Sequence, residues 1–127
     1  MPRMTILLVE DNQMVQNAVR ETLELEGWRV DVCGDGFTAL RKIESSDHYD
    51  LILTDNDLPG VSGLELIECV RTLTHRKRTP VIMLSASQHQ VESRVAGANE
   101  FLRKPEDIGL IVETIKRLLA TPTESSY

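Results

Sequence analysis

Short, uninterrupted apolar runs alternate along the chain with longer segments whose apolar positions recur every three or four residues. Runs of four or five apolar residues are typical of parallel strands covered on both faces, whereas the longer spacing indicates amphipathic helices. The runs predict strands at Ile6–Val9, Leu51–Thr54 and Pro80–Leu84. Strict alternation of apolar and polar residues over Trp28–Cys33 predicts a half-exposed edge strand, and Phe101 begins a short fifth strand.

Helical spacing fills the intervals between these strands and continues after the last one. The predicted helices cover residues 14–23, 39–43, 64–73, 91–96 and 108–119. The fourth is the weakest, because only Val91, Val95 and Ala96 form its apolar set. The 14 residues of Ala86–Asn99 leave room for about two helical turns.

This alternation predicts an α/β fold: a doubly wound (βα)5 sandwich around a five-stranded parallel sheet, with a short or irregular fourth helix. Parallel strands place all their carboxyl ends at one edge of the sheet, where ligands bind in such folds. The residues that follow or end these strands should therefore converge there. They are Glu10, Asp11, Asp55, Ser85 and Lys104.

Three of these converging residues are acids. Carboxylates at roughly 5 Å repel each other by about 3 kcal/mol per pair at an effective dielectric near 20, so a hard dication such as Mg²⁺ is expected among them. Simpler interpretations stay open for single positions. Asp55 fits a turn cap before Pro59-Gly60, Ser85 a helix cap, and Lys104 an ordinary surface lysine.

Composition places the chain among globular single domains, with 127 residues, 41% of them hydrophobic and 27% charged. The formal net charge of −6 argues against nucleic-acid and anionic-membrane surfaces, and the basic cluster His75–Arg78 is interpreted as a solvated loop. Cys33 and Cys69 lack zinc or disulfide spacing and are expected as core thiols. The apolar run near the start is too short for a signal peptide, so a cytoplasmic location is expected.

Four segments resemble the receiver domains of two-component response regulators. They are Leu8–Asn12, Leu51–Gly63, Ile82–Ala86 and Gly97–Pro105, in the order and on the strand ends of that family. The resemblance covers nearly the whole chain and implies a CheY-like receiver domain over residues 1–120, followed by a polar tail or linker over residues 121–127. It also implies a flavodoxin-like fold with strand order 2-1-3-4-5.

The resemblance further implies a chemistry and a role for each site residue. Asp55 would be phosphorylated from a phosphohistidine donor with Mg²⁺, and Lys104 and Ser85 would contact the phosphoryl group. Metal ligands would be Glu10, Asp11, Asp55 and the backbone carbonyl of Asn56. Ser85 and Phe101 would form the switch, although Phe101 also fits a half-buried aromatic on an edge strand. The Lys104-Pro105 bond would be cis.

The implied protein is a phosphoacceptor rather than a conventional enzyme. Its partners would be a sensor histidine kinase or histidine phosphotransfer protein, and a downstream output domain or protein, with no direct contact to nucleic acid or membrane. Two features depart from the family pattern. Asp57 adds a fourth acid near the site, and the segment from Ser85 to Lys104 is about three residues short.

Two alternatives of other classes remain. A receiver-like module that is not phosphorylated would recognise partners by its surface alone. Asp55-Asn56-Asp57 is also similar to the DxD motif of haloacid-dehalogenase-like phosphatases, although Pro59 and the short chain fit that family poorly.

Overall fold

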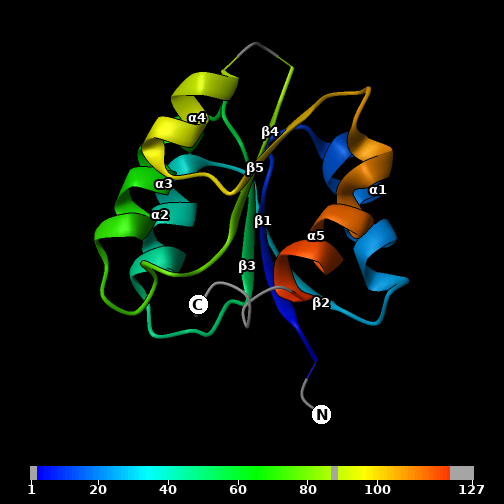
Figure 1. Ribbon diagram of the computed structural model, residues 1–127, viewed down its shortest axis with the longest axis horizontal. Helices are drawn as coiled ribbons and strands as arrows, with labels where there is room; N and C mark the ends of the chain where they lie inside the picture. Colours follow the sequence, from blue (N-terminus) through cyan, green and yellow to red (C-terminus); the bar gives the residue numbers. More distant parts are fainter. Residues whose placement is uncertain (1–2, 87–88, 121–127) are drawn as a thin grey trace.

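Five parallel strands form a central sheet with helices on both faces (Figure 1). The structure is a computed structural model that describes residues 3–86 and 89–120. α1 and α5 lie on one side of the sheet, and α2, α3 and α4 lie on the other. The elements follow in the order β1 Thr5–Val9, α1 Gln13–Glu24, β2 Arg29–Cys33, α2 Gly36–Glu44, β3 Leu51–Asp55, α3 Gly63–Thr72, β4 Val81–Ser85, α4 Gln90–Ala96, β5 Glu100–Arg103, a 3₁₀ turn Ile108–Leu110 and α5 Ile111–Ala120.

The strand order is β2-β1-β3-β4-β5, which confirms the predicted flavodoxin-like topology. β2 is an edge strand, as its alternating pattern predicted, and most of its residues are partly exposed. The central strands β3 and β4 are buried along their whole length.

Two hydrophobic cores form because consecutive strand residues point to opposite faces of the sheet. Leu7 and Ile52 belong to the core beneath α2 and α3, whereas Ile6, Leu8 and Leu51 belong to the core beneath α1 and α5. Every position of such a strand must therefore be apolar, which is why the sequence shows continuous runs rather than alternation.

Side-chain caps fix where the first three helices begin. Asn12 accepts a hydrogen bond from the Val15 N–H at the start of α1, and Asp35 does the same for Thr38 in α2. Ser62 opens α3 with a reciprocal capping box. Such caps satisfy N–H groups that lack partners within the helix.

The last predicted helix differs in its first turn, which is a 3₁₀ turn over Ile108–Leu110 rather than α-helix. Gly109 lies inside that turn, and glycine weakens α-helix through its backbone freedom. α4 is the short helix that the sequence predicted, with seven residues.

The interpretation of His75–Arg78 as a solvated loop is wrong for one residue. Arg76 is 2% exposed, and its guanidinium donates hydrogen bonds to the carbonyls of Lys42, Ile43 and Ser45 at the end of α2. It also lies over the Tyr49 ring, 4.8 Å from its centroid. The last carbonyls of a helix have no N–H four residues further along the helix, so they provide acceptors that the local charge pattern does not reveal.

The predicted core thiols are only partly confirmed, since Cys33 is buried whereas Cys69 is half-buried. The polar tail at 121–127 lies outside the described residues. Across residues 3–86 and 89–120, the helices lack the length and apolar character that crossing a bilayer requires.

Candidate functional site

The carboxyl ends of β1, β3, β4 and β5 lie side by side at one edge of the sheet. Val9 is paired with Thr54, Asp55 with Leu84, and Ser85 with Arg103. This register brings together the five residues that the sequence placed at strand ends. Glu10 and Asp11 follow β1, Asp55 ends β3, Ser85 ends β4 and Lys104 follows β5.

Lys104 joins two of the acids. Its Nζ donates to Glu10 Oε1 at 3.0 Å and to Asp55 Oδ2 at 3.2 Å. Glu10 and Asp55 are buried, with 1% and 3% of their surfaces exposed. The lysine therefore lies inside the site, and the alternative of an ordinary surface lysine is wrong.

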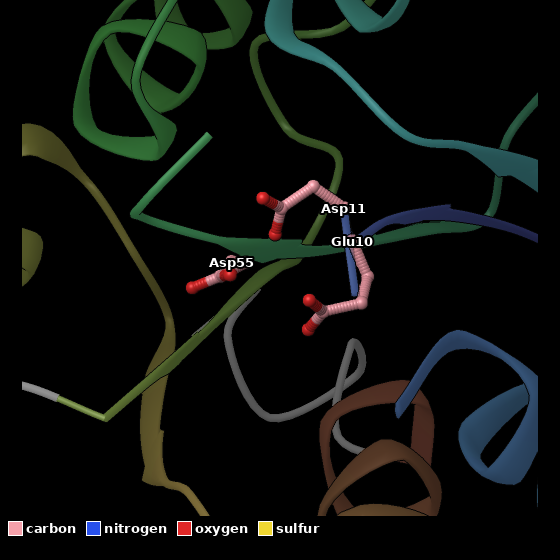
Figure 2. Close-up of side chains that lie close together, drawn as sticks. All are labelled: Glu10, Asp11 and Asp55. Carbon is pink, nitrogen blue, oxygen red and sulfur yellow. The ribbon is translucent and has the colours of Figure 1, made fainter. Parts of the chain in front are cut away.

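Asp11 completes an acidic group with Glu10 and Asp55. One oxygen from each of the three carboxylates lies within 4.8 Å of the others. Figure 2 shows the side chains of Glu10 and Asp11 directed toward the side on which Asp55 lies. Among the described residues this is the only such group, and oxygens so arranged suit a hard cation such as Mg²⁺.

Burial dominates the electrostatics of this group. It raises the pKa of Glu10 and of Asp55 above their ordinary values, while hydrogen bonds and the charge of Lys104 act in the opposite direction. Burial also works to lower the pKa of Lys104, but the contacts with Glu10 and Asp55 outweigh it and the pKa is raised. The lysine stays charged and only partly balances the acids, so a cation would be stabilised there.

The loop that follows β3 orients the Asp55 carboxylate. The N–H of Asp57 in the loop donates to Asp55 Oδ1 at 3.2 Å, whereas Lys104 donates to Oδ2. Thr54 Oγ1 donates to the Asp55 carbonyl at 2.9 Å. The acid is thus fixed through both its side chain and its main chain.

The carbonyl of Asn56, predicted as a main-chain metal ligand, already accepts two hydrogen bonds. Its oxygen accepts hydrogen bonds from the N–H groups of Leu58 at 3.0 Å and Gly63 at 3.1 Å. A carbonyl oxygen has two lone pairs, so a metal would have to displace one of these donors.

The two predicted switch residues lie on neighbouring strands, Ser85 at the end of β4 and Phe101 within β5. Ser85 is fully buried at the end of β4, and its carbonyl accepts the Lys104 N–H at 3.0 Å. Phe101 is 8% exposed and belongs to the core that α2 and α3 cover, so it is more buried than a half-exposed edge aromatic. The Lys104-Pro105 bond is cis, as the resemblance implied.

Two supporting residues escaped the sequence analysis. Gln16 Nε2 donates to the Glu10 carbonyl at 2.8 Å, and the Asn12 N–H donates to Glu10 Oε2 at 3.0 Å. Since Lys104 holds the other oxygen, both carboxylate oxygens of Glu10 have donors. Gln16 lies one turn into α1. Its position six residues after Glu10 was the only sequence signal that its side chain could reach the end of β1.

The comparison with protein families supports the resemblance found in the sequence. A family profile described as "Response regulator receiver domain" matches residues 6–116. Among curated proteins, the transcriptional regulatory protein HprR of Escherichia coli is 37% identical over 120 residues, which are 91% of this chain and 52% of HprR. ResD of Bacillus subtilis is 33% identical, over 96% of this chain and 50% of ResD. The chain thus spans about half the length of these relatives.

Solved structures include receiver domains of similar size. A CheY-like receiver domain protein of Methanospirillum hungatei superimposes with a TM-score of 0.88 at 29% identity, over 98% of this chain and 99% of that one. The receiver domain of the sensor histidine kinase PA1611 of Pseudomonas aeruginosa gives 0.82 at 32% identity, over 91% and 97%. That structure is described with a magnesium ion coordinated in its active-site cleft.

Proposed function

Since this chain belongs to the response regulator receiver domain family, we propose that it carries a signal as a phosphoryl group on Asp55. The observation that supports this most strongly is the buried carboxylate itself. Asp55 is 3% exposed, its Oδ1 is held by a main-chain N–H, and its Oδ2 is held by Lys104. A carboxylate fixed in this way is prepared for in-line attack, and positioning provides much of the catalysis of phosphoryl transfer.

A magnesium ion would be held by Glu10, Asp11 and Asp55, whose carboxylate oxygens lie within 4.8 Å of one another. Asp11 is exposed, whereas both oxygens of Glu10 and of Asp55 already accept hydrogen bonds, so the ion would take the place of some of these donors. When bound, the ion would neutralise the acids and the charge of the incoming phosphoryl oxygens.

In the transfer itself, an Asp55 carboxylate oxygen attacks the phosphorus of the donor. A new phosphorus–oxygen bond forms, and the bond between phosphorus and the donor atom breaks. The bonding electrons leave with the donor, which is the imidazole of a phosphohistidine or the acetate of acetyl phosphate. The product is an acyl phosphate on Asp55.

The flanking residues would stabilise and report that product. Lys104 would move its hydrogen bond from Asp55 to a phosphoryl oxygen, and the Ser85 hydroxyl would donate to another. Phe101 would respond by repacking beside Ser85, which would alter the surface formed by α4 and β5. A sensor histidine kinase or phosphotransfer protein would be the donor, and an output domain or a separate protein would receive the signal.

Intact-mass measurement tests this function directly. Incubation with acetyl phosphate and Mg²⁺ should add the mass of one phosphoryl group, and a chelator should prevent it. Asp55→Asn should abolish the addition, because an amide is not a comparable nucleophile. Asp57→Asn is the matched control, since it removes a neighbouring acid that is not the acceptor, and it should still be labelled.

Two other outcomes would point elsewhere. Equal labelling of Asp55→Asn would show that another residue accepts the phosphoryl group. Absence of labelling in wild-type protein would favour the interaction module, whereas continuous hydrolysis of small phosphate esters would favour the phosphatase.

A further inference from the structure

An exposed aromatic side chain of α2 lies against the loop that follows Asp55. Phe37 stands in the first turn of α2 with 62% of its surface exposed, and it is part of neither hydrophobic core. Its ring lies against Gly60. That glycine has φ +86°, and a Cβ there would lie 2.6 Å from Phe37 Cδ2. The ring occupies the space that any other side chain at this position would need.

The main chain beside Phe37 makes a second contact with the same loop. The Gly36 N–H donates to the Pro59 carbonyl at 2.9 Å. A Cβ on Gly36 would overlap the Val61 carbonyl, so the two backbones touch directly. The start of α2 therefore holds the crest of the loop at Pro59, Gly60 and Val61.

The base of this loop is joined to the site. The Asn56 side chain accepts the Leu64 N–H at 3.1 Å, and the Asp57 N–H donates to Asp55 Oδ1 at 3.2 Å. Any shift of the crest must be taken up between these anchors. The Asp57 peptide lies within this short interval, so the orientation of Asp55 depends on where α2 holds the crest.

We propose that Phe37 is a positioning residue for phosphoryl transfer to Asp55. Its ring holds Gly60, the loop holds the Asp57 N–H, and that N–H holds the attacking carboxylate. The inference rests on the proposed function, since it concerns the same reaction. Phe37 acts on Asp55 only through the loop, so it is a positioning residue and not a catalytic one.

The exposure of Phe37 makes this role separable from folding. A side chain that keeps most of its surface in water contributes little to burial, and it has no place in either core. Truncation should therefore leave thermal unfolding almost unchanged while loosening the loop. Truncation of a residue needed only for the fold would lower the thermal unfolding midpoint and leave the transfer rate of the folded protein unchanged.

The test compares Phe37→Ala with wild type, using acetyl phosphate as the donor. This donor has no protein surface, so a lost docking contact cannot explain a slower reaction. We expect the limiting rate at saturating Mg²⁺ to fall roughly threefold to tenfold, because misplacing a reacting group slows transfer even when the metal is bound. The thermal unfolding midpoint should stay at the wild-type value.

Leu25→Ala is the matched control, since Leu25 is an exposed apolar residue at the far end of α1, and its rate should equal that of wild type. Phe37→Tyr keeps the ring and should restore the rate. A wild-type rate for Phe37→Ala would overturn the inference, and so would a slow rate that Phe37→Tyr fails to restore. Failure of the proposed function is distinguishable, because wild-type protein would then not be labelled at all.

Discussion

At the scale of single residues, the Asp55 carboxylate is held by two different parts of the chain. Lys104 binds one oxygen and the Asp57 N–H binds the other. Glu10 shares the same lysine, so one ammonium group serves two buried acids, with Asp11 close by. The site contains more negative charge than the protein neutralises. Such an imbalance costs folding stability and prepares the site for a cation.

Replacing Asp55 by asparagine should therefore stabilise the metal-free protein. The remaining Glu10–Lys104 pair would be balanced, and we expect a gain on the order of 1 kcal/mol in the free energy of unfolding at pH 7. The pKa of Asp55 is raised in the folded protein. At pH values just above the ordinary aspartate pKa, the folded protein therefore binds more protons than the unfolded chain. Wild-type stability is then lost as pH rises through this window.

Urea unfolding in chelator at pH 4 and pH 7 measures this effect. The advantage of Asp55→Asn should be larger at pH 7, because the raised pKa of Asp55 makes the wild-type protein lose stability as the pH rises. Asp47→Asn removes an exposed aspartate near the start of β3 and serves as the control. An equal advantage at both pH values, or destabilisation at pH 7, would contradict the explanation.

At the scale of elements, the three helices on the α2–α4 side are held unequally. α2 is fixed at its start by the contacts of Gly36 and at its end by Arg76. α4 lacks a side-chain cap at its start, and its apolar residues Val91 and Val95 are 71% and 83% exposed. The structure thus holds α4 mainly through its last turn.

Arg71 of α3 provides that attachment. Its guanidinium donates to the carbonyls of Gly97, Lys77 and Thr79 and to the Asn99 side chain. Burial lowers its pKa, although an arginine stays charged throughout the neutral range. One side chain therefore joins the end of α4 to the loop between α3 and β4.

Removing this attachment should loosen α4 more than any other helix. We expect Arg71→Ala to lower the free energy of unfolding by about 1 kcal/mol, because partly buried carbonyls lose their donors. Hydrogen exchange at residues 90–96 should be faster than in α5 in the wild-type protein, because Val91 and Val95 of α4 are exposed, and the substitution should increase it further.

Arg78→Ala removes an exposed arginine from the same loop region and should change neither quantity. Equal increases of exchange in α4 and α5 would show that Arg71 acts on global stability alone.

At the scale of the whole molecule, the site draws its groups from the first, third, fourth and fifth strands. Lys104 contacts Glu10 across 94 positions of sequence and Asp55 across 49. A ligand bound at this edge therefore binds only the folded chain. Binding of this kind stabilises the entire domain through mass action.

Magnesium should accordingly raise the unfolding free energy of wild-type protein. At a concentration 100 times its dissociation constant, the increase should be about 2.7 kcal/mol. Asp11→Asn removes the exposed carboxylate and should lose most of this increase, while Asp47→Asn should keep it. Thermal or urea unfolding with and without Mg²⁺ at constant ionic strength provides the measurement. Full stabilisation of Asp11→Asn would exclude Asp11 as a ligand.

Local patterns in the sequence are enough to predict the elements and the convergence of the site. The runs at Ile6–Val9 and Leu51–Thr54 mark buried strands because each face of a parallel sheet needs apolar residues. Polar residues that end such runs must meet at one edge, so Glu10, Asp55 and Lys104 were predicted together. Periodicity and strand ends are local properties of the chain, and hydropathy therefore reports them.

Which atoms meet at the site depends on how the elements pack in the folded chain. The two donors on Asn56, the burial of Arg76 against the end of α2, and the Phe37 ring on Gly60 each join segments that are separate in the sequence. The hydropathy pattern does not encode such contacts. The hydropathy of a residue is the same whichever distant segment packs against its carbonyl or its side chain. Packing of one element on another selects the partner, and this requires the whole fold.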